Sequence, residues 1–275
     1  MPFPSPFFLN FAPMDLNLTG KRALVCGSSD GIGKAAAEEL ARMGAEIVLL
    51  ARNADKLEKA KQDLSTSHNQ KHTFLVADFD DPIHLESVMN HYLNEGNEIN
   101  ILVNNTGGPP AGPAHLAGLE EYVTAFRRHL LCNQLLVKLT LEGMKKSGYG
   151  RIINVISTSV KVPLNNLGVS NTVRGAVGNW SKTLANELGQ FGITVNNVLP
   201  GATETGRLKS IIENKAKKLS ISEKEAAGKM TAEVPLNRFA KPEEVANAIA
   251  WLASPAAAYV SGINLPVDGG RTPSL

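Results

Sequence analysis

The chain has few cysteines, little excess charge and no long hydrophobic run. Its two cysteines, Cys26 and Cys132, cannot form a disulfide framework; they suggest a reducing, intracellular setting, and we expect both as buried structural thiols. A net charge of +2 without a long basic run gives no indication of a nucleic-acid partner. No segment reaches about eighteen uninterrupted apolar residues, so no membrane span is expected. A cytoplasmic protein is therefore predicted.

The length and composition favour one large domain. With 275 residues, 43% of them hydrophobic and 20% charged, the chain suits a single α/β domain, and no linker divides it. The first segment, residues 1–13, is rich in Pro and Phe and lacks the basic start of a secretory signal, which predicts a surface arm before a domain at 14–275. Because the ordered pattern begins just after Met14, the native start is left open between Met1 and Met14.

A glycine-rich loop from Gly27 to Gly33 is the clearest binding signal. A short apolar run, Ala23 to Cys26, leads into it, and good helix formers follow from Ile32 to Met43. The loop glycines let the backbone turn sharply and approach a ligand. The helix that follows offers unpaired N–H groups, where a pyrophosphate can bind. A glycine triad alone is equally compatible with an ordinary turn, so the strand before it and the helix after it carry the interpretation.

Strand-like and helix-like segments alternate along the rest of the chain. Six further strands are expected: Glu46–Ala51, Thr73–Ala77, Ile101–Val103, Arg151–Ile156, Ile193–Leu199 and Ile263–Val267. The expected helices are Ala54–Leu64, one that Pro82 opens, Leu119–Lys146, Thr172–Leu188 and Pro242–Ala253. A polar, Lys-rich piece at 206–230 is predicted to be helical and mobile and to contact the substrate.

This alternation predicts the fold class. Parallel neighbouring strands need crossover helices, and the right-handedness of those crossovers restricts the topology. The prediction is a single doubly wound α/β domain of the Rossmann type, with helices on both faces of a parallel sheet. Ligands of such sheets bind beyond the carboxyl ends of the strands, so we expect the loops after residues 26, 51, 78, 104, 157 and 199 to form the site.

Two charged residues of this edge bear on the choice of nucleotide. Arg52 follows the second strand, where an acid would bind the 2′-hydroxyl of NAD and an arginine favours the 2′-phosphate of NADP. No acid occupies residues 49–53, which favours NADP(H) over NAD(H), although the charge of Asp30 on the same edge opposes a phosphate. Asp78 closes the third strand, where its carboxylate can bind an adenine amine or cap the next turn.

Several spaced motifs resemble the short-chain dehydrogenase/reductase family, from about Leu16 to Gly270. They are the glycine loop, Asn104-Asn105-Thr106-Gly107, Pro200-Gly201 and Asp268-Gly269-Gly270. The resemblance implies a seven-stranded sheet, a nicotinamide cofactor and a homotetramer or homodimer built partly on the two long helices. The cofactor-binding residues it implies, with those discussed above, are Gly27, Ser29, Gly31, Ile32, Gly33, Arg52, Asp78, Phe79, Asn105, Gly107, Arg174, Pro200, Gly201, Thr203 and Thr205.

The catalytic motif departs from that family. Its members use a Tyr as acid/base, a Lys four residues later and an earlier Ser, and Ser157 matches the Ser. The same alignment places Ser170 at the Tyr position, thirteen residues after Ser157, and Arg174 at the Lys position. An aliphatic hydroxyl is a far weaker acid than a phenol, and an arginine stays protonated. We therefore expect Ser157 and Ser170 to polarise a substrate oxygen and Arg174 to hold ribose hydroxyls.

The proton must then come from water or another side chain. His129, near the position where the family often carries an Asn, Lys161 and His115 are candidates, and each is more simply explained as an ordinary packed or solvated residue. The leading hypothesis is an NADP(H)-dependent oxidoreductase acting on a carbonyl or alcohol of a small molecule, resembling 3-oxoacyl-carrier-protein reductases. The alternatives are a nucleotide-binding protein without redox activity, or non-redox lyase or hydrolase chemistry in the same pocket. No metal is expected.

Overall fold

The computed structural model describes residues 13–274; residues 1–12, which make up nearly all of the expected arm, and residue 275 lie outside the described range. Within that range one sheet has seven parallel strands in the order β3-β2-β1-β4-β5-β6-β7. The strands are β1 (Arg22–Cys26), β2 (Glu46–Ala51), β3 (Thr73–Val76), β4 (Ile101–Asn104), β5 (Gly150–Val155), β6 (Ile193–Pro200) and β7 (Asn264–Val267). The predicted fold class is confirmed, and the predicted strand ends agree to within one residue.

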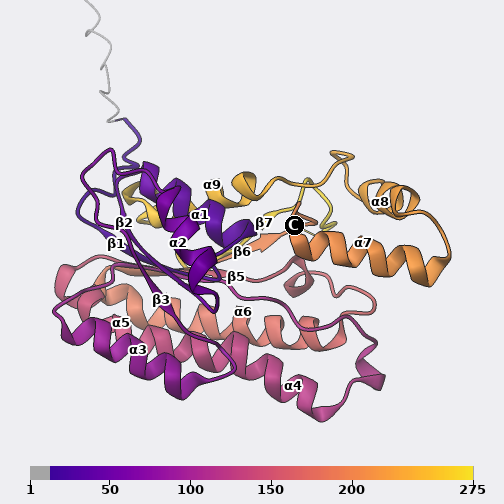
Figure 1. Cartoon of the computed structure of the whole chain (residues 1–275), viewed down its shortest axis with the longest axis horizontal. Helices are drawn as coiled ribbons and strands as arrows, with labels where there is room; N and C mark the ends of the chain where they lie inside the picture. The colour runs from indigo at the N-terminus through magenta and orange to yellow at the C-terminus, as the bar shows by residue number, and fades with distance from the viewer. Residues whose placement is uncertain (1–12, 275) are drawn as a thin grey trace, which may run out of the picture.

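Helices cover both faces of this sheet (Figure 1). On one face lie α1 (Gly31–Arg42), α2 (Ala54–Gln62) and α9 (Pro242–Ala253). On the other lie α3 (Pro82–Asn94), α4 (Leu119–Phe126), α5 (Cys132–Ser147) and α6 (Gly168–Leu188). Two separate hydrophobic clusters fill the layers, so each face of the sheet has its own core.

Both cysteines are buried in the core on the α3–α5–α6 face. Cys26 and Cys132 are free thiols with no exposed surface. Burial raises the pKa of the Cys132 thiol to about 11, and burial also raises that of Cys26. The expectation that both thiols are buried is confirmed, and a protonated thiol is a poor nucleophile and metal ligand.

The expected single helix over Leu119–Lys146 is wrong in one respect. A π-helical turn, Arg127–Leu131, separates α4 from α5 and carries His129. Neither Gly nor Pro marks this position, so the sequence gives no sign of the extra residue in the turn. Such π turns are frequent at functional sites.

α6 begins one turn earlier than expected, at Gly168 instead of Thr172. The Gly168 N–H donates to the Gly112 carbonyl at 3.0 Å, which joins the start of α6 to the loop after β4. A Cβ on Gly168 would lie 2.4 Å from Cα of Ala114, so only glycine fits there. This contact between distant segments, which local sequence patterns do not reveal, fixes the start of the helix.

Four asparagines, three of them buried and Asn264 half-buried, form a ladder across β4, β5, β6 and β7. Asn104 Nδ2 donates to Asn154 Oδ1 at 2.8 Å, Asn154 Nδ2 to Asn197 Oδ1 at 3.1 Å, and Asn197 Nδ2 to Asn264 Oδ1 at 2.8 Å. Successive members are direct neighbours in the strand register. Ser181 of α6 accepts from Asn154 Nδ2 at 2.9 Å and donates to Asn197 Oδ1 at 2.7 Å. Side-chain bonds therefore supplement backbone bonds in this half of the sheet.

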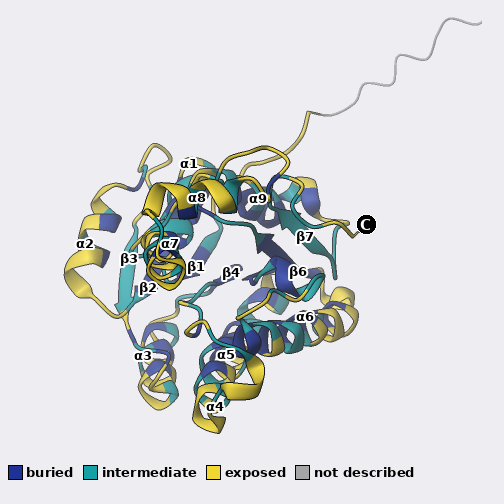
Figure 2. Ribbon diagram, turned by 90° about the vertical axis from the view of Figure 1, so that its right-hand side faces the viewer, coloured by how far each residue is buried: buried dark blue, intermediate teal, exposed yellow. Residues whose placement is uncertain are grey.

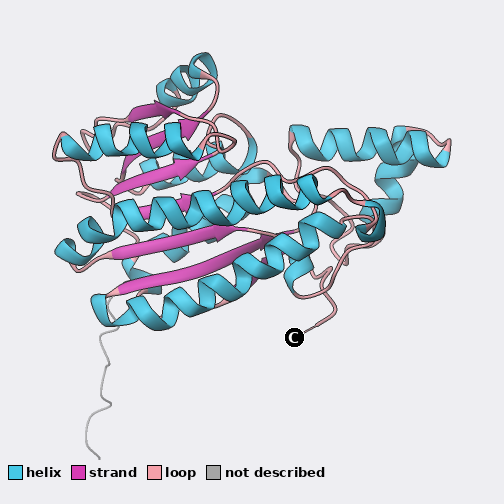
Figure 3. Cartoon of the chain, turned by 90° about the horizontal axis from the view of Figure 1, so that it is seen from below, coloured by secondary structure: helices cyan, strands magenta, loops and turns pink. Residues whose placement is uncertain are grey.

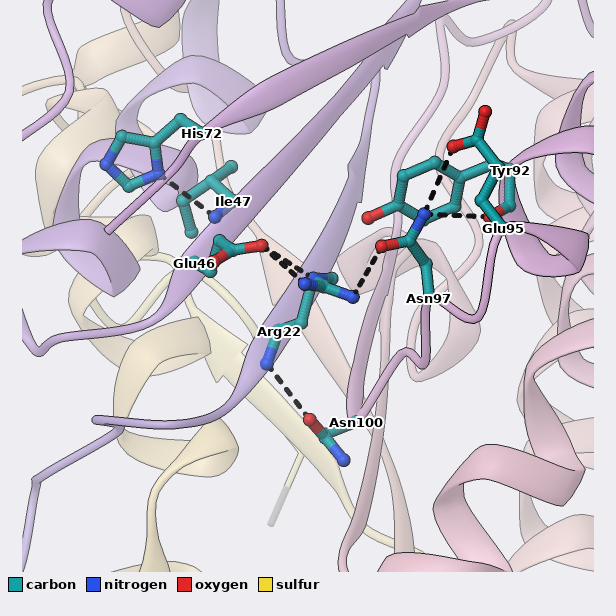
Figure 4. A network of polar contacts seen from close by, with 8 residues as sticks. All are labelled: Arg22, Glu46, Ile47, His72, Tyr92, Glu95, Asn97 and Asn100. Carbon is teal, nitrogen blue, oxygen red and sulfur yellow. Dashed lines mark hydrogen bonds and ion pairs between the residues drawn. The ribbon is translucent and has the colours of Figure 1, made fainter. Parts of the chain in front are cut away.

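A different polar network lies at the amino-terminal ends of the strands (Figure 4). The Arg22 side chain donates to Glu46 Oε1 at 2.8 Å and to Asn97 Oδ1 at 3.0 Å, and its backbone N–H donates to Asn100 Oδ1 at 3.0 Å. This network joins β1, β2 and the loop before β4 at the edge opposite the predicted site.

Two helices, α7 (Gly206–Leu219) and α8 (Glu223–Thr231), extend beyond the carboxyl ends of the strands (Figure 3). From here on, we call these two helices together the arm; the N-terminal segment of residues 1–13 is a different part of the chain. The arm confirms the expected helical character of this piece, although a break at residues 220–222 divides it. Most of its surface is exposed (Figure 2), and its buried side chains are Leu208, Ala216 and Ala226. Among residues 13–274, none of the helices has the length and apolarity to cross a membrane.

Candidate active site

The glycine loop has a geometry that only glycines allow. Gly27 and Gly31 have φ values of +59° and +55°, in the left-handed region. A Cβ on Gly33 would lie 2.2 Å from the Gly27 carbonyl oxygen, and one on Gly27 would lie 2.7 Å from the Asn105 carbonyl oxygen. The Leu50 N–H donates to Ser28 Oγ at 3.0 Å and fixes the loop to β2, a role that sequence reasoning did not assign.

The first turn of α1 can bind an anion. Asp30 caps the helix, because its carboxylate accepts a hydrogen bond from the Gly31 N–H at 2.7 Å. The next N–H groups of this turn, those of Ile32 and Gly33, are the donors that a pyrophosphate would use. We call the closely packed loop backbone from Gly27 to Gly33 the glycine cradle. This cradle and the N–H donors of the first turn together fit the diphosphate of a dinucleotide.

Asn105 joins this cradle to the loop after β4. Its Nδ2 donates to the Cys26 carbonyl at 3.2 Å and to the Gly27 carbonyl at 3.3 Å. Gly107, two residues later, is exposed at the same edge, while Ser29 lies half-buried in the loop itself. The predicted cofactor residues of two loops that lie far apart in the sequence are therefore adjacent.

The residues predicted to hold the adenosine end lie together after β2 and β3. Nη1 of Arg52 lies 3.6 Å from Oδ2 of Asp78, an exposed ion pair. Asp78 Oδ1 accepts the Asp80 N–H at 3.0 Å, so Asp78 also caps the turn, one of the two roles considered for it. Phe79 is buried, and its carbonyl oxygen accepts a hydrogen bond from the Cys132 thiol at 3.3 Å. This bond joins the loop after β3 to α5.

The loop after β6 packs between two other motifs. The Gly201 N–H donates to the Val267 carbonyl at 2.9 Å, and a Cβ on Gly201 would lie 2.8 Å from Cα of Asp268. Thr205 caps α7, and its Cγ2 lies 3.0 Å from the position of a Cβ on Gly31. A cavity of about 610 Å³ lies between α1 and the arm beside this contact. Pro200 is the last residue of β6, and Thr203 is buried in the loop that follows.

The three residues predicted to be catalytic come from β5 and α6. Ser157 follows β5; its Oγ accepts the Ser159 N–H at 3.1 Å, so its own O–H remains free to donate. Ser170, in the first turn of α6, and Arg174, one turn later, are both buried. Arg174 Nη1 donates to the Val155 carbonyl at 3.0 Å, two residues before Ser157.

His129 and Arg174 keep well-defined charges at neutral pH. Burial and the charges of Arg174, Arg128 and Arg207 lower the pKa of His129 to about 3, so its imidazole is neutral at pH 7. His129 Nε2 is buried without a hydrogen-bond partner among the described residues. Burial and the charge of Arg207 lower the pKa of Arg174 to about 10, so the guanidinium remains protonated at pH 7. His129 therefore holds no acidic imidazolium proton under these conditions.

The other two candidate proton donors lie at short 3₁₀ turns. Lys161 ends the short 3₁₀ turn after Ser157, and His115 is exposed in a turn before α4. Within residues 13–274, no group of three or more His, Cys, Asp or Glu side chains could hold a metal ion. Sequence reasoning missed Arg207 of the arm, whose guanidinium donates to the carbonyls of Gly108 and Pro109 at 3.1 and 2.7 Å.

A family model described as "Enoyl-(Acyl carrier protein) reductase" matches residues 27–272, nearly the whole of this architecture. The chain belongs to the short-chain dehydrogenase/reductase family. The site above is thus built on a dehydrogenase/reductase scaffold, as the motifs predicted. A solved structure described as a "short chain dehydrogenase/reductase family protein" superposes with a TM-score of 0.79 over 94% of this chain and 100% of that one, at 29% identity.

Individual members of the family match over nearly their full length. The 3-oxoacyl-[acyl-carrier-protein] reductase FabG of Escherichia coli is 35% identical over 93% of this chain and 98% of its own. The NADPH-dependent reductase BacG of Bacillus subtilis is 30% identical over 94% of this chain and 100% of its own. L-sorbose reductase from Gluconobacter frateurii, solved with NADPH and L-sorbose, has a TM-score of 0.88 at 32% identity and covers 95% of this chain and 100% of its own.

Proposed function

We propose that this protein is an NADP(H)-dependent oxidoreductase that acts on a carbonyl or alcohol group of a small molecule, in the manner of the 3-oxoacyl reductases. The observation that carries the proposal is the glycine cradle at the start of α1, with Asn105 bonded to its backbone. Relatives that cover nearly the whole chain are NADPH-dependent or were solved with NADPH, which supports the choice of cofactor.

The residues after β5 and on α6 would bind and orient the substrate. The bound nicotinamide would supply or accept a hydride at its C4 atom. The Ser157 O–H donates to the carbonyl oxygen, with Ser170 as a second hydroxyl, because hydrogen-bond donors aimed at that oxygen stabilise the charge that develops there. Arg174, fixed by the Val155 carbonyl, offers further N–H groups to the ribose hydroxyls. With His129 neutral, solvent water supplies the proton.

Arg52 is expected to set the preference for NADP(H). Replacing it by Glu places a carboxylate beside Asp78 and removes the charge that faces a 2′-phosphate, so the Kd for NADPH should rise about tenfold or more, equivalent to about 1.4 kcal/mol. The Kd for NADH should stay the same or fall, because an acid at this position can bind the 2′-hydroxyl of the ribose. Fluorescence titration with both nucleotides measures this. Lys59→Glu, the same charge change on α2, is the matched control, and an equal loss in that variant would assign the effect to general electrostatics.

The double variant Ser170→Tyr with Arg174→Lys tests the catalytic assignment. A phenol beside a lysine would supply the missing acid, and general acid catalysis contributes about 10²-fold or more. We therefore expect kcat/KM for NADPH oxidation across a panel of ketones to rise by that factor relative to wild type. Ser170→Tyr alone is the control, with a smaller gain. No gain in the double variant would show that the pocket itself has diverged from ketone reduction.

One second candidate function has a specific observation in its favour. Neither Ser170, protonated Arg174 nor neutral His129 is an acid or base suited to pH 7. The second candidate is therefore a protein that binds NADPH to sense or store it and does not turn it over. Such a protein needs the glycine cradle to bind the nucleotide, and it needs no acid or base. Saturable NADPH binding with no oxidation on any ketone of the panel would favour this candidate.

We also propose that the protein forms a cytoplasmic homodimer or homotetramer. Leu119, Val123 and Phe126 of α4 lie on one face at helical spacing, with Leu119 82% exposed and the other two at least 40% exposed. A monomer in water gains nothing from such an apolar stripe, whereas a second copy would cover it. This proposal also rests on the resemblance, which implies assembly through the same long helices.

A further inference from the structure

Two arginines from opposite sides of the site meet beside Gly108. A Cβ on Gly108 would lie 3.2 Å from Nη2 of Arg207 and 3.4 Å from Nη2 of Arg174, so both guanidinium groups border one small volume. Arg207 comes from the arm, while Arg174 comes from the buried face of α6. The two guanidinium groups therefore come from two different helices.

Neither guanidinium has an acidic partner. Among residues 13–274, every ion pair found involves other side chains; the partners of Arg174 and Arg207 are the carbonyls of Val155, Gly108 and Pro109. A guanidinium has five N–H donors, so those bonds leave several donors on each group. Arg174 is 8% exposed, whereas Arg207 is exposed to solvent; a second positive charge beside a buried guanidinium is unfavourable unless an anion joins them.

His129 extends this electropositive volume. The charges of Arg174 and Arg207 both act on its ring and lower its pKa. Because the ring is neutral and its Nε2 has no partner among the described residues, it can add a further hydrogen bond to a ligand without adding charge.

We propose that Arg174 and Arg207 together bind an anionic group of the substrate, a carboxylate or a phosphate. This inference rests on the proposed function and names its substrate class. Arginine binds such planar or tetrahedral oxyanions through pairs of N–H donors about 2.8 Å from the oxygens. Because Arg207 belongs to the arm, binding of the anion would also join the arm to α6 above the reacting carbonyl.

The test compares charged and neutral probes on the full chain. Acetoacetate, malonate and inorganic phosphate are titrated by calorimetry, with and without NADPH, beside ethyl acetoacetate as the neutral match for acetoacetate. We expect at least one anion to bind wild type and to raise its Tm, and the ester to bind at least tenfold more weakly than acetoacetate. Arg207→Gln should lose at least tenfold in anion affinity. Lys209→Gln, which removes the same charge two residues along on the arm, should keep that affinity.

The possible failures are distinguishable. Absence of binding by all three anions, equal binding of the ester, or equal loss in Lys209→Gln would overturn the inference. A loss of NADPH affinity in Arg207→Gln with anion binding intact would assign the arginines to the phosphates of the cofactor and also overturn it. If no form of the protein binds NADPH, the proposed function fails, while titration without NADPH still decides the anion site. If Arg207→Gln does not fold, the wild-type protein can be treated with phenylglyoxal, and modification of Arg207 can be followed by mass spectrometry. Slower modification in the presence of the anion than in its absence would support the inference, and an equal rate would overturn it.

Discussion

Replacing Gly33 by Ala is expected to abolish NADPH binding. The added Cβ would lie 2.2 Å from the Gly27 carbonyl oxygen and 2.7 Å from Asn105 Nδ2, so the loop must open and separate from the loop after β4. The N–H groups in the first turn of α1 and those of the glycine cradle would then no longer converge on one position for the diphosphate. Fluorescence titration should show NADPH affinity at least about 100-fold weaker, or about 2.7 kcal/mol.

The matched control is Gly228→Ala in α8. No atom lies within 4 Å of a Cβ at Gly228, so the same substitution should leave NADPH affinity unchanged. Because alanine is the better helix former, the variant should gain about 0.5–1 kcal/mol in the free energy of unfolding. Wild-type affinity in Gly33→Ala would mean that the cradle does not bind the nucleotide.

Replacing Asn154 by Leu is expected to lower the free energy of unfolding by about 3 kcal/mol. Asn154 is fully buried, and its side chain bonds to Asn104, Asn197 and Ser181. Leucine has similar volume but leaves those partners buried with unmet bonds, each costing about 1–3 kcal/mol before the protein relaxes. Urea denaturation followed by circular dichroism measures the change.

Asn179→Leu provides the comparison for this variant. Asn179 lies on the exposed face of α6, where substitutions usually change the free energy of unfolding by no more than about 0.5 kcal/mol. A loss below about 1 kcal/mol in Asn154→Leu would contradict a stabilising role for the ladder. It would mean that hydrophobic packing replaces the lost hydrogen bonds in full.

Backbone architecture was largely predictable from the sequence. Buried parallel strands appear as short apolar runs, and the helices between them have strong propensities and boundaries such as Pro82 and Pro242. The Asn ladder was not predictable, because it depends on which strands are neighbours and on their register, which the residues of a single strand do not give. The early start of α6 was missed because it depends on the tertiary contact with Gly112, and the π turn at Arg127–Leu131 was missed because no Gly or Pro marks it.

The candidate site was predictable where the fold alone brings residues together. The rule that ligands bind at the carboxyl edge placed Arg52 near Asp78 and Asn105 near the glycine loop, and both pairs are adjacent. Arg207 was missed because its partners, Gly108 and Pro109, precede it by nearly one hundred residues. No motif marks an arginine whose importance arises only when a helical extension folds back over a loop.

The layout of the arm has an evolutionary consequence. α7 and α8 contribute only three buried side chains, and neither adds a strand or a layer to the sheet. Insertions, deletions and charge reversals in the arm would leave the folding of the domain nearly intact. They would change the side chains that the arm presents to the carboxyl edge of the sheet. Related proteins could therefore acquire new substrates through substitutions in α7 and α8, with little effect on expression or on nucleotide affinity.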